Sequence, residues 1–314
     1  MRIGFIGAGT MAGRHLASLA HTGERIEVVG HVSRNPDRAK AAAEAFGGTA
    51  LNDPHALLAL RPDAVFVTVP PDGHGTIELD LIAAGIPFLV EKPIGLGSET
   101  PRRIAQAIDQ SGLVVAVGYN WRALTGLDTV RSILAAEPAR LALGQFHVGI
   151  PPAPWWRRHS QSGGQLVEQA CHLIDLARNL LGEGRLIAAT GNFDAMPGYP
   201  DADIAGASAA LFSFGRAPVT ITATCLLPGG PGAHLRIIAP GREIVITLAG
   251  IEIIEAGQSR RLPGGETSYV RQTRAFLAAV RSGQPSGVCC TYADALKTHA
   301  LCLAAATDMA TTLG

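Results

Sequence analysis

Two segments of this 314-residue chain carry side chains that could move protons. The first, residues 90–93 (Val-Glu-Lys-Pro), ends an apolar run and places an acid directly before a lysine. The second contains Glu168, His172 and Asp175, whose i, i+4 and i+7 spacing would place them on one face of a helix. An imidazole titrates near neutrality and an acid one turn away can orient it, so this spacing suits acid–base catalysis. A helix with a satisfied polar stripe fits the same spacing equally well.

A third segment could bind a cofactor. Residues 3–6 predict a strand and residues 11–21 predict a helix, with a glycine turn between them. Gly7 permits the sharp turn, Gly9 lets a pyrophosphate approach the backbone, and Ala12 lets the helix pack close to the strand. Strand, turn and helix N-terminus in this order form an anion site. We therefore expect a dinucleotide to bind at Gly7, Ala8, Gly9, Thr10 and Met11.

The end of the next predicted strand, residues 26–32, indicates which dinucleotide. In a Rossmann domain a carboxylate about 20 residues after the glycine turn binds the ribose 2′-hydroxyl. Here the strand runs into Ser33 and Arg34, and a guanidinium pairs well with a 2′-phosphate. Arg38 could add a second cation from the following helix. The sequence thus predicts a preference for NADP(H), with NAD(H) still usable, although Arg34 could also be an ordinary solvated loop arginine.

These segments need a scaffold, and the first 120 residues supply one. Apolar runs alternate with helical stretches, which is the pattern of a parallel, doubly wound sheet. The predicted strands are residues 3–6, 26–32, 64–69, 87–90 and 113–117. Ligands in such sheets bind outside the carboxyl ends of the strands, so Lys92 is expected at the cleft.

The character of the chain changes after residue 120. Residues 139–148 predict a strand, and residues 185–255 read as successive strands joined by short Pro/Gly turns, which indicates a mostly antiparallel sheet. Predicted helices cover residues 127–136, 165–181, 267–281 and 292–311. We therefore expect an α/β protein with a Rossmann domain at residues 1–120 and a substrate-binding and oligomerisation domain at residues 121–314, the C-terminal helices being able to pack back on the first domain.

Composition excludes several function classes. Twenty-six basic residues balance 26 acidic ones, which argues against nucleic acid or a membrane surface as partner. No apolar run approaches the ~18 residues that a membrane span needs. The ten histidines form no H-x-x-x-H pair, so no metal site is expected. Five cysteines without C-x-x-C spacing form a poor disulfide framework, and together with a strand starting at the second residue they favour the cytoplasm.

Together the motifs resemble one family. The glycine turn, Glu91-Lys92-Pro93, and Gly163-Gly164 followed by acid-x-x-x-His-x-x-Asp are similar to the Gfo/Idh/MocA oxidoreductases, the relatives of glucose–fructose oxidoreductase and inositol dehydrogenase. The resemblance covers nearly the whole chain. It implies a Rossmann domain followed by an α/β domain with a large open sheet that often makes oligomer contacts, giving a homodimer or homotetramer.

The resemblance also implies roles for individual residues. Lys92 is the lysine beside the reacting oxygen, Lys92-Pro93 is a candidate cis peptide, and His172 matches the catalytic histidine. Glu168 stands where many members carry aspartate, so its catalytic role is less certain than that of His172. Which of Lys92 and His172 takes the proton is left open, and Asp175 is assigned either to the substrate or to a structural role.

Other candidates flank these motifs. Pro70, His74, Glu91 and Lys92 are expected near the cofactor, although His74 could equally serve the loop or cap a helix. Asn120 and Arg122 are expected near the substrate, with an interdomain salt bridge as the alternative for Arg122. The loop at residues 151–164 is the main candidate for substrate recognition, through Trp155, Trp156 and Arg157, and one of the two tryptophans is expected to pin the loop instead.

The sequence therefore predicts an NADP(H)-preferring oxidoreductase that transfers hydride between nicotinamide and a secondary alcohol or ketone of a sugar, polyol or similar carbohydrate-like substrate. Two alternatives stay open: an imine- or tetrapyrrole-type reductase, and a regulator that senses NADP(H) without turnover. A sensor would need neither Lys92 nor His172.

Overall fold

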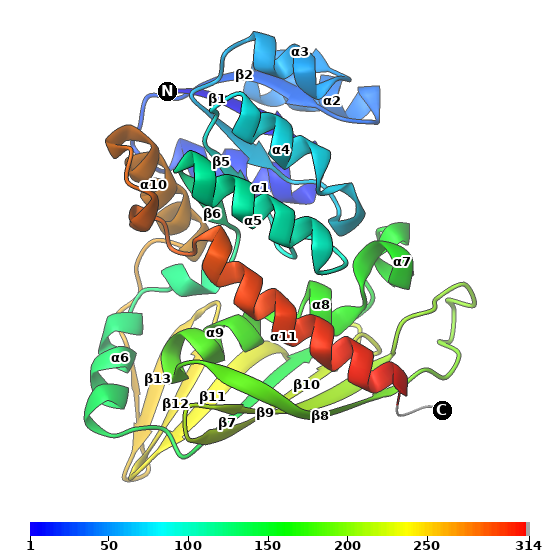
Figure 1. Ribbon diagram of the computed structural model, residues 1–314. Coiled ribbons are helices and arrows are strands. Elements are labelled where there is room, and N and C mark those ends of the chain that lie inside the picture. The colour runs from blue at the N-terminus through cyan, green and yellow to red at the C-terminus, as the bar shows by residue number, and fades with distance from the viewer. Residues whose placement is uncertain (312–314) are drawn as a thin grey trace. The chain divides into compact units, whose positions relative to one another are not determined.

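The computed structural model describes residues 1–311, and the chain divides into two compact units. Unit 1 contains Met1–Ala123 and Thr267–Leu296, and unit 2 contains Leu124–Glu266 and Lys297–Gly314. The division is therefore not a single cut in the sequence, because a segment near the C-terminus returns to the unit formed by the first 123 residues. Each unit has its own sheet (Figure 1).

The sheet of unit 1 is six-stranded and parallel, with the strand order β3-β2-β1-β4-β5-β6. Its strands are β1 (Arg2–Ile6), β2 (Glu27–Val32), β3 (Thr49–Leu51), β4 (Ala64–Val67), β5 (Phe88–Val90) and β6 (Val115–Val117). The strand order reverses direction between β1 and β4, which is the point where doubly wound sheets bind ligands. The glycine turn follows β1 directly and therefore lies at this point.

Helices pack on both faces of a doubly wound sheet, and in unit 1 an apolar cluster joins α1 (Thr10–Ala20) and α10 (Ser268–Ser282) to β1 and β4. The α4 and α5 helices lie side by side against the sheet (Figure 1). The remaining elements are α2 (Pro36–Phe46), α3 (Pro54–Ala59), η1 (Pro71–Gly73), α4 (Thr76–Ala83), α5 (Glu99–Ser111), η2 (Asn120–Ala123), η4 (Pro285–Gly287) and α11 (Tyr292–Thr311), and the unit division falls inside α11.

Unit 2 is built on an eight-stranded sheet with the order β14-β13-β12-β11-β7-β10-β9-β8. Neighbouring strands are antiparallel except β7 and β10, which are parallel. The strands are β7 (Leu141–His147), β8 (Gly184–Asn192), β9 (Ala207–Phe214), β10 (Ala217–Thr224), β11 (Gly232–Ala239), β12 (Arg242–Thr247), β13 (Gly250–Glu255) and β14 (Gln258–Arg261).

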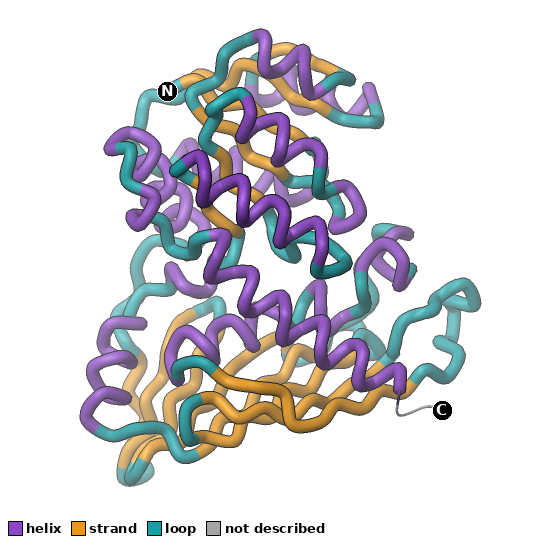
Figure 2. The backbone as a smooth tube through the Cα atoms, in the orientation of Figure 1, coloured by secondary structure: helices purple, strands orange, loops and turns teal. Residues whose placement is uncertain are grey.

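One face of this sheet is covered by α9, as the backbone trace also shows (Figure 2). The helices of unit 2 are α6 (Leu127–Ala136), η3 (Pro154–Arg157), α7 (His159–Ser162), α8 (Gln165–Glu168), α9 (Cys171–Leu181) and the main part of α11. Residues alternate between buried and more exposed along β9 and β10, as expected for strands with one covered face. In the described part of the chain no helix is long and apolar enough to span a bilayer.

The predicted fold class is confirmed, with both sheets present. The prediction of one continuous helix over residues 165–181 is wrong, because the helix is interrupted between α8 and α9. Strand β3 was not predicted, since it has only three residues, two of them exposed, and carries no apolar run. Strand β4 also ends at Val67, two residues earlier than predicted.

Candidate functional site

The glycine turn after β1 has the geometry that a dinucleotide needs. Gly7 has φ = 103°, and a Cβ there would lie 2.5 Å from the carbonyl oxygen of Thr68, so this position admits only glycine without rearrangement. At Gly9 a Cβ would meet no atom within 4 Å, so the space beside its backbone is open. Gly9 is also the N-cap of α1 and provides no side-chain cap, which leaves first-turn N–H groups available to an anion.

The other turn residues surround this open space. Ala8 and Met11 are partly buried, and Thr10 is the exposed first residue of α1. The Thr68 hydroxyl donates a 3.0 Å hydrogen bond to the carbonyl oxygen of Gly7, which fixes the turn against the end of β4. The residues present therefore fit a pyrophosphate lying over the N-terminus of α1.

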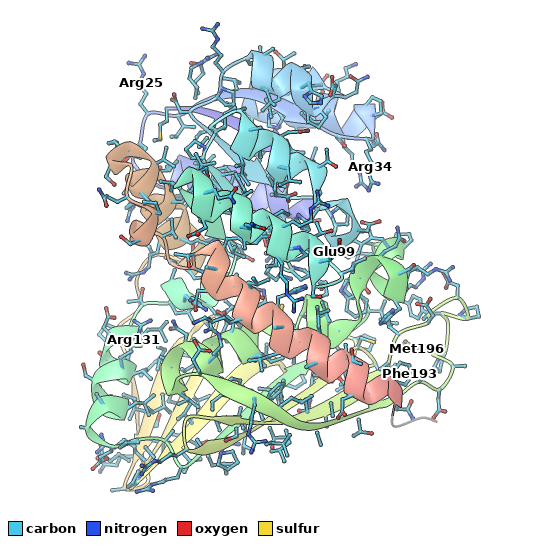
Figure 3. All side chains as sticks on the ribbon, viewed as in Figure 1. Arg25, Arg34, Glu99, Arg131, Phe193 and Met196 are labelled. Carbon is cyan, nitrogen blue, oxygen red and sulfur yellow. The ribbon has the colours of Figure 1, made fainter. Side chains whose placement is uncertain are left out.

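The end of β2 presents two cations. Arg34 and Arg38 are exposed, and neither makes an ion pair within residues 1–311 (Arg34 is labelled in Figure 3). Asn35 caps α2 by accepting hydrogen bonds from the N–H groups of Asp37 and Arg38, at 3.0 and 3.3 Å. Ser33 Oγ accepts the N–H of Asn35 at 3.1 Å, so the serine hydroxyl takes part in the same turn.

The segment after β4 contains Pro70 and His74. Pro70 is the partly buried N-cap of η1, and the His74 ring bonds Glu78 through Nδ1 at 2.6 Å. Glu78 also accepts the N–H of Gly75 at 2.6 Å, at the start of α4. Burial raises the pKa of the Glu78 carboxyl, but the charge and hydrogen bond of His74 and the Gly75 N–H outweigh it, so the pKa is lowered. This arrangement favours the helix-capping role for His74 over direct contact with a cofactor.

Lys92 follows β5, and its backbone is held by the preceding residue. Glu91 is 3% exposed and accepts a 2.7 Å hydrogen bond from His15 Nε2 on α1. Its second oxygen accepts the backbone N–H of Lys92 at 3.2 Å. A Cβ at Gly118 would lie 2.7 Å from this carboxylate, so only glycine leaves room for it. The peptide bond between Lys92 and Pro93 is cis, as the family resemblance led us to expect.

Tyr269, which the sequence did not single out, belongs to the same region of unit 1. Its ring lies edge-on to that of His15, with centroids 6.0 Å apart, and its hydroxyl accepts a 3.2 Å hydrogen bond from Arg14. Burial, followed by the charge of Glu91, raises the pKa of the Tyr269 hydroxyl, while Arg14 and Lys92 act in the opposite direction. A histidine on the buried face of α1, beside Ala12 and Leu16, is the sequence signal that could have identified this cluster.

Asn120 and Arg122 are both buried in unit 1. The amide of Asn120 donates a 2.9 Å hydrogen bond to Ser268 Oγ, at the start of α10. Arg122 forms an ion pair with Asp294, and its side chain is 4% exposed. Both partners of this ion pair belong to unit 1, so the Arg122–Asp294 pair is not itself an interdomain salt bridge.

The break between α8 and α9 changes the relation between Glu168 and His172. The N–H groups of both Gln169 and Ala170 bond to the carbonyl oxygen of Gln165, and helical bonding then restarts with shorter i→i−3 contacts. The i, i+4, i+7 face predicted for Glu168, His172 and Asp175 is therefore wrong for Glu168, and only the last two share one regular helix. His172 is partly buried at the second residue of α9.

Asp175 is fully buried and accepts a 2.8 Å hydrogen bond from the Thr298 hydroxyl. Thr298 in turn accepts a 3.1 Å hydrogen bond from Arg178 Nε. The chain of bonds joins α9 to α11 within unit 2. This placement favours the structural role for Asp175.

The loop at residues 151–164 is pinned by residues far along the chain. Trp156 is 2% exposed and donates its indole N–H to Glu168 at 2.6 Å, while Trp155 packs partly buried against the same apolar cluster. Arg157 forms an ion pair with Asp201 at 2.9 Å and lies over the ring of Tyr199. Two of the three candidates for substrate recognition are thus occupied in holding the loop, which the local sequence could not show.

The structure gathers the predicted cofactor residues at the carboxyl ends of the parallel strands of unit 1, and it places His172, Glu168 and the tryptophan loop in unit 2. The sequence did not identify five side chains from distant segments that contact the predicted site residues or their neighbours. These are His15, Tyr269, Asp294, Asp201 and Thr298. Across residues 1–311 no group of three or more His, Cys, Asp or Glu side chains is arranged to hold a metal ion.

Comparison with known proteins agrees with this architecture. Residues 1–119 match the model of the oxidoreductase family with an NAD-binding Rossmann fold, and residues 138–245 match the GFO/IDH/MocA C-terminal domain. The chain is 30% identical over 194 residues to D-glucoside 3-dehydrogenase of Escherichia coli, which covers 58% of this chain and 54% of that protein. It is 32% identical over 200 residues to inositol 2-dehydrogenase 2 of Saccharopolyspora erythraea, which covers 61% of this chain and 57% of that protein. The chain thus spans just over half the length of these curated relatives.

Solved structures share the fold along the whole chain. UDP-N-acetylglucosamine 3-dehydrogenase of Acidithiobacillus ferrooxidans has a TM-score of 0.84 at 20% identity, covering 100% of this chain and 99% of that one. A 3-ketoreductase of Actinomadura kijaniata, solved with NADP and TDP-benzene, has a TM-score of 0.85 at 21% identity, covering 98% and 97%. With both of its domains matched, the chain belongs to the Gfo/Idh/MocA family of oxidoreductases, whose N-terminal domain is an NAD-binding Rossmann fold.

Proposed function

We propose that this protein is an NADP(H)-preferring oxidoreductase that converts a secondary alcohol of a sugar, polyol or related cyclic substrate to the ketone, or the reverse. The observation that carries the proposal is the edge of the unit 1 sheet, where the open glycine turn and Lys92 follow β1 and β5. These parallel strands are separated by β4 alone, so their ends lie about 10 Å apart. The relatives named above act on glucosides and inositol, which favours this substrate class over imines and tetrapyrroles.

The chain's own residues divide the work of the reaction. The nicotinamide, when bound, supplies or accepts the hydride. In oxidation His172 acts as general base and takes the hydroxyl proton, while the Lys92 ammonium donates a hydrogen bond to the oxygen as negative charge develops. Glu91 holds the backbone at Lys92 through its N–H. Glu168 is bonded to Trp156 and serves to place the loop at residues 151–164 beside the segment that carries His172.

Substitution of Lys92 and His172 tests these roles. Lys92→Met and His172→Ala should each lower kcat by at least about a hundredfold, because acid–base and electrostatic contributions have that size. Cofactor affinity, measured by NADPH fluorescence, should stay near the wild-type value. Near-normal turnover in both variants contradicts the assignment. Cofactor binding without turnover of any sugar, sugar ketone, cyclitol or cyclic imine in a 340 nm assay would favour the sensor instead.

The cofactor preference is tested at the end of β2. Arg34→Ala should lower kcat/KM for NADP at least about tenfold and leave that for NAD nearly unchanged, because a guanidinium–phosphate contact exists only with NADP. Arg25→Ala is the matched control, since Arg25 is another exposed arginine of unit 1 (Figure 3). Equal or better use of NAD by the wild-type protein would overturn the preference.

We also propose that the open face of the unit 2 sheet joins copies of the chain into a dimer or tetramer, as the family resemblance suggests. Leu143 on β7 and Leu211 on β9 are each 38% exposed on strands whose alternate residues are buried. Light scattering coupled to size-exclusion chromatography should give a dimer or tetramer, and Leu211→Lys should shift it toward the monomer. A monomeric wild-type protein would contradict this proposal.

A further inference from the structure

A cavity of about 240 Å³ lies entirely within unit 2. Pockets that hold a whole drug-sized ligand span roughly 300–1,000 Å³, so this cavity suits one substituent of a larger molecule. Its walls come from the loop after β8, α8 and the last turns of α11. They are formed by His159, Gly163, Gly164, Gln165, Leu166, Phe193, Asp203, Ala205, Ser208, Ala306 and Met309.

The cavity walls are held by specific contacts. Asp203 accepts the backbone N–H of His159 at 2.5 Å and donates its own N–H to the carbonyl oxygen of Arg157 at 3.2 Å. The next residue, Ile204, packs with Trp156 in a buried cluster. The cavity is therefore built before any ligand arrives, because its polar and apolar supports are internal to the unit.

The lining determines what chemistry fits. Leu166, Met309 and Ala205 are buried and give an apolar wall, and Phe193 adds an aromatic ring that is 38% exposed (labelled in Figure 3). No lysine or arginine is among the lining residues, while Asp203 contributes a carboxylate. The one basic lining residue is His159, whose backbone N–H is bonded to the Asp203 carboxylate, so a phosphate or carboxylate would meet the Asp203 charge and no lysine or arginine. The lining therefore favours an uncharged, largely apolar group.

The cavity lies close in sequence and space to His172. Gln165 and Leu166 line it from α8, and His172 comes seven residues after Gln165 through two short helical segments. The carbonyl oxygen of Gln165 accepts the N–H of Gln169, and the carbonyl oxygen of Gln169 accepts the N–H of His172, so two backbone hydrogen bonds link the cavity wall to His172. A sugar ring at His172 could therefore carry a substituent that reaches the cavity.

We propose that this cavity binds an uncharged aryl or acyl substituent of the substrate, an inference that rests on the proposed function. The preferred substrates are then glycosides with an apolar aglycone and not nucleotide sugars. Nucleotide sugars carry a diphosphate next to the sugar, and the cavity offers that group the Asp203 carboxylate and no lysine or arginine. The proposal thus separates two substrate classes that the solved and curated relatives both include.

The test compares phenyl and methyl glucosides of the same anomeric form, with UDP-glucose as the charged probe. Binding is measured by calorimetry and turnover by the 340 nm assay, both with the full chain. The wild-type protein should bind the phenyl glucoside at least tenfold more tightly than the methyl glucoside. Ala306→Phe, which fills the cavity from α11, should remove that advantage and leave methyl glucoside binding unchanged.

Ala304→Phe is the matched control, because Ala304 is an exposed residue two positions earlier on α11 that does not line the cavity. Phe193→Ser is a second variant, which removes an aromatic ring from the cavity lining without filling the cavity. It should also reduce the preference for the phenyl glucoside over the methyl glucoside. Equal binding of the two glucosides, an advantage that survives Ala306→Phe, or tighter binding of UDP-glucose would each overturn the inference. Cavity-dependent binding without turnover would overturn the proposed function and leave the binding site standing.

Discussion

The glycine turn of unit 1 and the tryptophan loop of unit 2 both offer groups to a ligand, but they are held in place in different ways. The turn depends on neighbours in sequence: a strand ends, Gly7 adopts φ = 103°, and α1 begins three residues later. The loop at residues 151–164 depends on partners about 40 residues away, such as Asp201 for Arg157. Backbone geometry can be anticipated from a local motif, whereas the pairing of charged side chains depends on which segments the fold brings together.

Substitution of His15 should have the largest effect, because it removes a buried partner of Glu91 in unit 1. His15→Ala removes the hydrogen bond from Nε2 to the buried Glu91 carboxylate, and breaking such a pair costs about 3–5 kcal/mol of unfolding free energy. Urea unfolding measures this change. His21→Ala, on an exposed residue of the C-terminal end of α1, is the control and should have little effect. Equal unfolding free energies of the two variants would show that the His15–Glu91 pair does not stabilise unit 1.

The glycine turn should separate stability from cofactor binding. Gly7→Ala introduces a Cβ that meets Thr68 and a strained φ, so we expect a loss of about 3 kcal/mol in stability. Gly9→Ala places a Cβ in open space, so stability should hold while cofactor affinity falls. Thermal unfolding and cofactor titration measure the two quantities. A cofactor affinity unchanged in Gly9→Ala would mean that the dinucleotide does not approach this backbone.

Substitution in the loop at residues 151–164 should lower stability less than Gly7→Ala does. Trp156→Phe keeps most of the buried ring but removes the N–H that Glu168 accepts, and a hydrogen bond to a charged group is worth about 2 kcal/mol. Trp155→Phe, which leaves that bond in place, is the matched control. If both variants unfold at the same urea concentration, the Trp156–Glu168 bond does not stabilise the loop.

Substitution of Asp201 should have the smallest effect on stability, and this effect should depend on pH. The hydrogen bond from Arg157, ahead of the charges of Arg157 and Arg158, lowers the pKa of this carboxyl despite partial opposition from burial. Its contribution to stability is therefore present above the ordinary aspartate pKa of about 3.9 and is lost as the pH falls through the lowered value. The wild-type protein should melt slightly above Asp201→Asn near neutral pH, and the difference should vanish in acid. A difference that grows in acid would reverse the assigned sign.

Much of unit 1 was predictable because its signals are local. The parallel strands are apolar runs, and the N-cap of α3 is Asp53 followed by proline, a pattern readable from the chain alone. Strand β3 escaped prediction because three mostly exposed residues form no pattern. In unit 2, periodicity could not reveal the interruption of the helix at Gln169 and Ala170, since apolar positions continue through it.

The sequence by itself determined the two-sheet fold, the glycine turn, and the strand end that is followed by Lys92, but it placed His172 inside one long helix and not at the start of α9. These features follow from backbone conformation and apolar periodicity, which act over a few residues. Only the tertiary structure decided that Arg122 pairs with Asp294, that Glu168 holds Trp156, and that a cavity without lysine or arginine lies beside α8. Such pairs require segments distant in sequence to meet, and their partners depend on packing of the whole unit.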